Sequence, residues 1–159
     1  MLVLIASEKE VEEEIPILLG LFKAGLEVFH LRKPSYTRLE HRKFLDAIPP
    51  EYHPRIMLHY HHELIKEYNL KGLHFTEAHR KKAADELQRN QGEDFAISSS
   101  FHQEAELSAC PVEFDYHFLS PVFDSISKID YKGKEMDVKH IKKTVIGLGG
   151  VNPKNLSRL

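Results

Sequence analysis

The chain has 159 residues, enough for one domain with its own hydrophobic core. Its 22 basic and 24 acidic side chains leave a formal net charge of −2, which argues against a nucleic-acid partner or an anionic membrane surface. The apolar runs are too short to span a bilayer, no targeting peptide is visible, and the lone Cys110 has no internal disulfide partner. We therefore expect a cytoplasmic protein with a passive thiol.

Short apolar runs alternate with amphipathic stretches along the chain. The apolar runs predict seven buried strands, at residues 2–6, 27–31, 55–59, 72–75, 94–98, 116–119 and 145–148. The first helix is predicted to begin at a capping box of Ser7 and Glu10 and to end at Gly25. The other predicted helices cover residues 39–48, 62–68, 80–89 and 137–142, with two more beginning near Gln103 and at Pro153.

Seven strands alternating with helices predict a parallel sheet covered by helices. Open doubly wound sheets usually have fewer strands, so we predict an α/β chain of the TIM (β/α)8-barrel type, as a single domain over residues 1–159. A complete barrel has eight units and about 200 residues or more. We therefore expect the eighth strand and helix to be absent from this chain.

Two of the predicted strands end in loops suited to an anion. Ser125, Ser127 and Lys128 follow strand 116–119 and offer two hydroxyls and an ammonium group. Gly149 and Gly150 follow strand 145–148, where backbone N–H groups beside a helix N-terminus favour phosphate. A solvated loop and a simple glycine turn are the alternatives. Together the loops predict a small phosphorylated substrate at one end of the sheet.

Arg32 follows the buried strand 27–31, so we expect its guanidinium at the mouth of the barrel, gripping a carboxylate or phosphate. A surface salt bridge is the alternative. His102 follows strand 94–98 and is a candidate proton shuttle, because imidazole titrates near neutral pH. Alternatively, Ser100 and Gln103 form a capping box and His102 is an incidental first-turn residue.

Eleven histidines are unusual for this length, and the densest group is His59, His61, His62, His74 and His79. The His59-x-His61 pattern at a strand end is one that zinc hydrolases use, with His74 as the one further ligand well placed. We favour hydrogen-bonded or solvated histidines instead. On that interpretation His62 begins a helix and faces water, while His59 and His74 are available to a substrate.

Six segments resemble the thiamine phosphate synthase family, which also contains the thiazole tautomerases. Two are specific: the segment from Ser120 to Lys128 is similar to the family's Gly-Pro-x-Phe/Tyr-x-Thr-x-Thr-Lys, and Leu148-Gly-Gly-Val-Asn152 to its Ile-Gly-Gly-Ile. The weaker matches are His30-Leu-Arg32-Lys33, Leu58-His59-Tyr60, Gly72-Leu-His74 and Ser100-Phe-His102. The family lysine two residues after the arginine is Pro34 here.

The resemblance implies a TIM barrel, a place in thiamine biosynthesis and a thiazole phosphate substrate. The family's synthases join a pyrimidine pyrophosphate to a thiazole phosphate with Mg²⁺, whereas its tautomerases shift a double bond in a thiazole carboxylate phosphate. The catalytic residues that we predict are His102, Arg32 and Lys128. The predicted substrate and phosphate contacts are His30, Lys33, His59, His74, Ser100, Ser125, Ser127, Gly149 and Gly150.

The family's two Mg²⁺-binding aspartates fall on Tyr60 and His79, neither of which supplies the carboxylate that Mg²⁺ prefers. We therefore expect no metal, and we favour a tautomerase-type isomerisation that needs one proton shuttle and a phosphate anchor. The alternatives are a Mg²⁺-dependent synthase, a non-catalytic binder of a phosphorylated ligand, and the zinc hydrolase. The sequence also allows a homo-oligomer.

Overall fold

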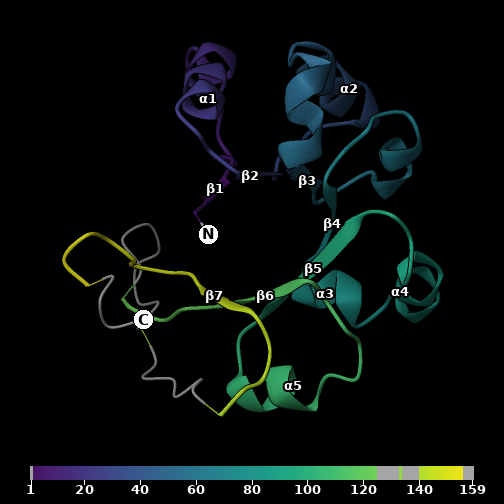
Figure 1. Cartoon of the computed structure of the whole chain (residues 1–159), viewed down its shortest axis with the longest axis vertical. Helices are drawn as coiled ribbons and strands as arrows, with labels where there is room; N and C mark the ends of the chain where they lie inside the picture. The colour runs from purple at the N-terminus through teal and green to yellow at the C-terminus, as the bar shows by residue number, and fades with distance from the viewer. Residues whose placement is uncertain (1, 125–132, 134–139, 156–159) are drawn as a thin grey trace. The chain divides into compact units, whose positions relative to one another are not determined.

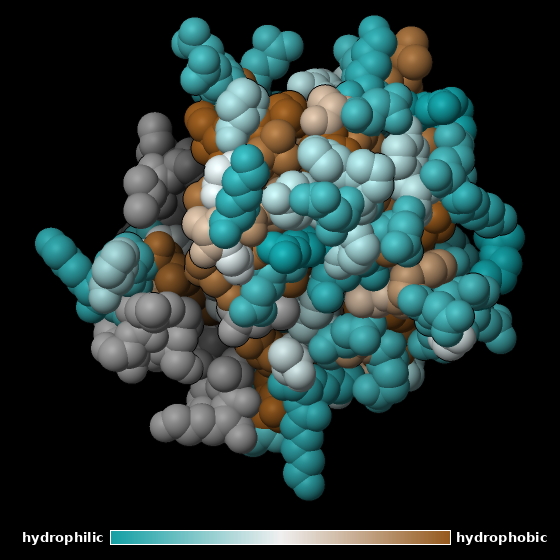
Figure 2. Space-filling model, turned by 45° about the horizontal axis from the view of Figure 1, so that its top comes forward, coloured by the Kyte–Doolittle hydropathy of each residue, from teal (hydrophilic) through white to brown (hydrophobic). Residues whose placement is uncertain are grey.

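The computed structural model describes residues 2–124, 133 and 140–155. The chain folds into two compact units: unit 1 comprises Met1–His74 and Asp94–Ala96, and unit 2 comprises Phe75–Glu93 and Ile97–Leu159. In the residues that the structure describes, no helix has the length and apolar character needed to cross a membrane. Polar side chains cover much of the described surface on the face drawn in Figure 2, with hydrophobic side chains visible between them.

Unit 1 contains parallel strands that pair in chain order, and α1 and α2 lie on the same side of them (Figure 1). The strands are β1 (Val3–Ile5), β2 (Val28–Leu31), β3 (Ile56–Leu58) and β4 (Gly72–Phe75), whose last residue belongs to unit 2. β2, β3 and β4 are buried along their whole length. This burial is typical of parallel strands covered on both faces and explains their continuous apolar runs.

The helices of unit 1 pack an aromatic core against β2. They are α1 (Glu14–Lys23), α2 (Arg38–Asp46) and the 3-10 helices η1 (Pro50–Arg55) and η2 (His62–Lys66). The ring of Phe22 on α1 stacks on Tyr52 and meets Phe29 edge to face, while Phe29 stacks on Phe44 of α2. α2 begins with a capping box, in which Glu40 N–H donates to the Thr37 hydroxyl at 3.3 Å and Thr37 N–H to the Glu40 carboxylate at 2.6 Å.

Two helix predictions in unit 1 are wrong. The first helix begins at Glu14 rather than near Ser7, since Glu13 has a left-handed φ of 53° and the Lys9 carbonyl accepts a hydrogen bond from Lys33 Nζ. The predicted helix 62–68 is the shorter 3-10 helix η2, which follows another left-handed residue, His61 with φ 56°. In both places a local backbone turn precedes the helix, and hydrophobic spacing does not reveal it.

Unit 2 contains three parallel strands that pair in chain order: β5 (Ala96–Phe101, with Ala96 in unit 1), β6 (Tyr116–Leu119) and β7 (Val145–Gly147). Its described helices are α3 (Glu77–Arg80), α4 (Ala84–Asn90) and α5 (Glu104–Ala109). α5 lies below β5 and β6 in the view of Figure 1. Phe101 of β5 packs edge to face on Phe114, and Leu107 of α5 is fully buried.

Four further helix predictions fall in unit 2. The predicted helix 80–89 is confirmed over residues 84–89 by α4, but its start is wrong, because α3 ends at Arg80 and α4 begins separately at Ala84. The capping box of Ser100 and Gln103 is also wrong: Ser100 lies inside β5, and the Gln103 side chain makes no capping hydrogen bond. The predicted helix 137–142 and the one from Pro153 fall largely outside the described residues.

The α/β class is confirmed, with seven parallel strands among the described residues. The strands Gly72–Phe75 and Tyr116–Leu119 have the predicted bounds, and the others lie within a few residues of theirs. The closed barrel, its missing eighth unit and the single-domain organisation stay predictions.

Candidate functional site

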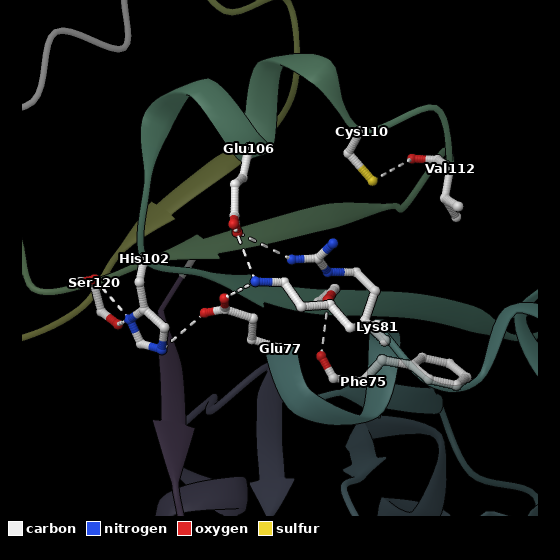
Figure 3. Close-up of polar contacts among 10 residues, drawn as sticks. Phe75, Glu77, Lys81, His102, Glu106, Cys110, Val112 and Ser120 are labelled. Carbon is white, nitrogen blue, oxygen red and sulfur yellow. Dashed lines mark hydrogen bonds and ion pairs between the residues drawn. The ribbon is translucent and has the colours of Figure 1, made fainter.

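His102 lies directly after β5 in unit 2, with 41% of its side chain exposed. Its Nδ1 is 2.9 Å from the Ser120 carbonyl oxygen and 3.1 Å from the Ser120 hydroxyl (Figure 3). A carbonyl oxygen only accepts hydrogen bonds, so Nδ1 carries the proton of the neutral ring and Nε2 keeps a lone pair. Ser120, at the end of β6, thereby fixes both the orientation and the tautomer of His102.

The Nε2 of His102 faces a carboxylate. Glu77 is the first residue of α3, and its Oε2 lies 3.5 Å from His102 Nε2 (Figure 3). A hydrogen bond from Lys81 is the main cause that lowers the pKa of Glu77, so its carboxylate is ionised at neutral pH. An ionised carboxylate attracts the N–H of a protonated ring. The His102–Glu77 pair can therefore take up one proton and give it back.

Lys81 and Arg80 connect the surroundings of Glu77 to a second carboxylate, that of Glu106. Lys81 lies between Glu77 and Glu106 in Figure 3, with Nζ 3.0 Å from Glu106 Oε1. Arg80 lies 3.8 Å from Glu106 Oε2, and its guanidinium sits 4.0 Å above the centre of the Phe101 ring. α3, α5 and β5 are thus tied together around Glu77, which limits its side-chain motion.

Gly149 and Gly150 form a turn after β7 that packs on the segment following β6. Their φ values of 91° and 65° favour glycine, and a Cβ on Gly150 would lie 2.2 Å from the Asp124 carbonyl oxygen. Backbone hydrogen bonds of 2.8 and 3.0 Å join Val122 N–H to the Leu148 carbonyl and Phe123 N–H to that of Gly149. The predicted glycine turn is therefore adjacent to the segment from Ser120 to Asp124, which also holds His102.

The other residues predicted to contact the substrate from these strand ends lie partly inside and partly outside the described structure. Ser125, Ser127 and Lys128 lie outside the described residues. Ser100 lies within β5, opposite Phe118 of β6. The Asn152 side chain accepts a hydrogen bond from Lys154 N–H at 2.9 Å, as an N-cap side chain does. All the predicted contacts of these residues with a substrate stay predictions.

Arg32 and Lys33 both have carboxylate partners within unit 1. Arg32 forms an ion pair with the exposed Glu8, which is the surface salt bridge that the sequence left as the alternative. Lys33 is fully buried, with Nζ 2.6 Å from Glu14 Oε2 and 3.1 Å from the Lys9 carbonyl. Lys33 therefore joins the segment after β2 to the start of α1, and its predicted contact with a substrate stays a prediction.

His30, His59 and His74 form a buried cluster in unit 1, referred to below as the three-histidine cluster. His30 Nδ1 lies 2.8 Å from His59 Nε2, and the His59 and His74 rings stack with their centres 4.1 Å apart. Burial lowers the pKa of His30 to about 3. Burial is also the main cause that holds the pKa of His59 and of His74 well below the ordinary value, with the neighbouring histidines and Arg32 as further causes. These surroundings favour the neutral form of the three imidazoles.

The surroundings of His62 and His61 differ from those predicted. His62 does not face water: it is buried in η2, and its Nε2 lies 3.2 Å from the His74 carbonyl oxygen. His61 Nε2 lies 3.2 Å from the Tyr36 carbonyl oxygen, so His61 has a partner outside the three-histidine cluster. His59 therefore meets His30 and His74 of the neighbouring strands rather than His61.

The residues at the family's Mg²⁺ positions do not fit that ion. Tyr60 lies in unit 1 among the rings of His41 and His59. His79 lies in unit 2, with Nε2 2.9 Å from Glu86 Oε2 and its backbone N–H 3.2 Å from the Thr76 hydroxyl. A phenol and an imidazole are not the hard carboxylate ligands that Mg²⁺ prefers.

Sequence reasoning missed Glu77 and Lys81. The available signal was position, because Thr76 and Glu77 directly follow the buried strand 72–75, at the strand end where catalytic residues gather in parallel α/β folds. The contact of Glu77 with His102 depends on how α3 packs beside β5, and no local pattern reveals that.

The comparisons with known proteins that find a match point to one family. The family model described as thiamine monophosphate synthase matches residues 2–159. A crystal structure of thiamine phosphate pyrophosphorylase from Bacteroides thetaiotaomicron is similar, with 26% sequence identity, a TM-score of 0.73, and coverage of 99% of this chain and 76% of that chain. No curated protein sequence matches significantly. The chain belongs to the thiamine monophosphate synthase family of thiamine biosynthesis.

Proposed function

We propose that this protein isomerises a thiazole carboxylate phosphate, moving one proton between two carbons without a metal. The observation that carries the proposal is the His102–Glu77 pair, an imidazole of fixed orientation facing an ionised carboxylate. Its partial exposure leaves room for a substrate to approach the ring. A proton shuttle of this kind contributes about 10²–10⁴-fold to a rate.

In the proposed reaction His102 Nε2 removes a proton from a carbon of the thiazole ring. The electron pair of that C–H bond forms the new double bond, the electrons of the old double bond move to the second carbon, and His102 returns a proton there. Glu77 stabilises the imidazolium between the two steps, while Ser120 keeps Nδ1 protonated throughout.

The substrate phosphate would bind at the Gly149–Gly150 turn, with Ser125, Ser127 and Lys128 as further contacts. The closeness of this turn to the segment that begins at Ser120 supports the assignment, since one rigid set of loops would hold both the phosphate and the proton shuttle. The role predicted for Arg32 stays a prediction, and its guanidinium is paired with Glu8 within unit 1.

The second candidate is the synthase reaction, in which a thiazole phosphate displaces pyrophosphate from a pyrimidine pyrophosphate. It is favoured by the description of the matching family and by the name of the similar structure. Mg²⁺ would neutralise the leaving pyrophosphate in that reaction. The residues at the two family positions for that ion, Tyr60 and His79, count against it.

One experiment separates the candidates. Protein that includes any C-terminal continuation is incubated with the thiazole carboxylate phosphate alone, and separately with pyrimidine pyrophosphate and thiazole phosphate, each with and without Mg²⁺. Isomerisation without Mg²⁺ supports the proposal, and thiamine phosphate formed only with Mg²⁺ makes the protein a synthase. Thermal stabilisation by thiazole phosphate without turnover in either assay identifies a non-catalytic binder.

A further inference from the structure

The three-histidine cluster is built by the register of unit 1. Met57 of β3 pairs with Gly72 of β4, so His59 and His74, each two residues further along, lie at the same level and on the same face. His30 of β2 pairs with Met57, one layer below His59 on that face. Three neighbouring strands thus deliver one imidazole each to the same place.

The nitrogen atoms of this cluster are close enough to share one ion. One ring nitrogen from each histidine lies within 4.8 Å of the other two, and the His30 Nδ1 to His59 Nε2 separation is 2.8 Å. In a tetrahedral zinc site with Zn–N bonds of 2.0–2.1 Å, two ligand nitrogens lie roughly 3.3 Å apart. The measured separation is shorter than that value and the others are at most 4.8 Å, so modest rotations of the rings would bring the three nitrogens to it.

The side chains of the cluster are of the type that binds transition metals. An imidazole binds a metal in its neutral form, through a nitrogen lone pair. His59 Nδ1 is buried and has no hydrogen-bond partner among the residues that the structure describes, an arrangement that costs free energy in a metal-free protein. A bound cation would give one nitrogen of His59 a ligand bond, and a rotation of the ring would allow the other nitrogen to form a hydrogen bond.

From this geometry we propose that His30, His59 and His74 form a binding site for a divalent transition-metal ion of the zinc class, with a fourth coordination position open. Three imidazole donors select such ions over Mg²⁺ and Ca²⁺, which require oxygen ligands. The positive charge of the neighbouring Arg32 would repel a bound cation, but the ion pair of Arg32 with Glu8 offsets this repulsion. The site differs from the His59-x-His61 pattern and from the family's Mg²⁺ positions.

The test uses Co²⁺ as a spectroscopic probe for Zn²⁺. Chelator-treated full-length protein is titrated with Co²⁺, and a competing titration adds Zn²⁺. We expect intense visible d–d absorption that saturates near one equivalent, disappears on adding one equivalent of Zn²⁺, and accompanies a rise in unfolding temperature. Saturation at micromolar Co²⁺ or below supports the site. The absence of that absorption at 100 µM Co²⁺ overturns it.

Two substitutions locate the ion. His59→Gln should weaken binding by at least 100-fold, whereas the matched control His61→Gln, two residues away and bonded to Tyr36, should leave it unchanged. Equal binding by the wild type and His59→Gln would place the metal elsewhere, on exposed histidines, and overturn the proposal. A second measurement does not depend on the folding of His59→Gln. Long-range ¹H–¹⁵N NMR spectra of the wild-type protein are recorded with and without Zn²⁺, and the proposal predicts that the imidazole resonances of three buried histidines shift. Shifts confined to the resonances of exposed histidines such as His102 and His140 would contradict the site.

Discussion

The two units place their histidines in contrasting surroundings. In unit 1 His30, His59 and His74 are almost completely buried, contact mainly one another and are kept neutral by burial. In unit 2 His102 keeps 41% of its side chain exposed and has a carbonyl oxygen on one nitrogen and a carboxylate facing the other. The same side chain is thus suited to ligation or packing in unit 1 and to proton transfer in unit 2.

The comparison shows that surroundings, rather than residue type, identify a candidate acid–base residue. A proton shuttle needs solvent or substrate access together with a partner that stabilises the charged ring, and His102 has both. In the buried cluster, burial is the main cause that lowers the pKa of each ring, so protonating one of them is unfavourable.

The largest expected effect is on catalysis in unit 2. His102→Gln should lower the rate of thiazole carboxylate phosphate isomerisation by about 10²–10⁴-fold, because Gln cannot take up the proton. The unfolding temperature should change little, since the side chain is half exposed. His140→Gln is the control, because His140 is an exposed residue paired with Glu104. An unchanged isomerisation rate in His102→Gln would remove His102 from the mechanism.

The second effect is on the stability of unit 1. Glu14→Gln should destabilise the protein by about 3–5 kcal/mol, because it leaves the ammonium of Lys33 buried without its carboxylate. Glu8→Gln, which breaks the exposed ion pair with Arg32, should cost at most about 1 kcal/mol. Urea unfolding of both variants measures the difference. Equal costs would mean that Lys33 finds another partner or reaches solvent.

The third effect is the pH dependence of stability in metal-free protein. The folded-state pKa of each clustered histidine lies below its unfolded value, so between pH 6.5 and about pH 4 the unfolded chain binds more protons. Stability therefore falls as pH decreases through this window. Each histidine contributes up to about 1.4 kcal/mol per pH unit. His74→Gln should reduce the slope by one proton, as measured by urea unfolding across that range, and an unchanged slope would show that His74 is protonated in the folded state.

The smallest effect concerns the partner of His102. Glu77→Gln should reduce isomerisation by about tenfold, corresponding to roughly 1.4 kcal/mol, because the imidazolium intermediate loses a nearby negative charge. The loss should appear in kcat and not in KM, since Glu77 acts on the ring of His102 rather than on the substrate. The control is Glu104→Gln, whose carboxylate faces His140. A rise in KM with an unchanged kcat would contradict this role of Glu77.

The strands could be predicted from sequence because each is a short apolar run bounded by polar residues, as at Gly72–Phe75 and Tyr116–Leu119. Helix starts were less predictable. Glu13 and His61 adopt left-handed backbone conformations, and tertiary contacts such as that of Lys33 with the Lys9 carbonyl accompany them. Local propensity does not contain this information.

The candidate site was predictable in part. His102 and the Gly149–Gly150 turn follow strands, so their position at strand ends could be anticipated. Glu77 was not, because its role depends on the packing of α3 beside β5. The three-histidine cluster was not either, since the sequence shows His59 next to His61, whereas the register between strands brings His59 to His30 and His74.

The most direct test of proton transfer by His102 is deuterium exchange. The thiazole carboxylate phosphate is incubated with the protein in D₂O without Mg²⁺, and ¹H NMR follows the hydrogen on the reacting ring carbon. The account predicts that deuterium enters that carbon with the wild-type protein and that His102→Gln abolishes the exchange. Absence of exchange while the substrate is bound, or exchange that continues in His102→Gln, would contradict it.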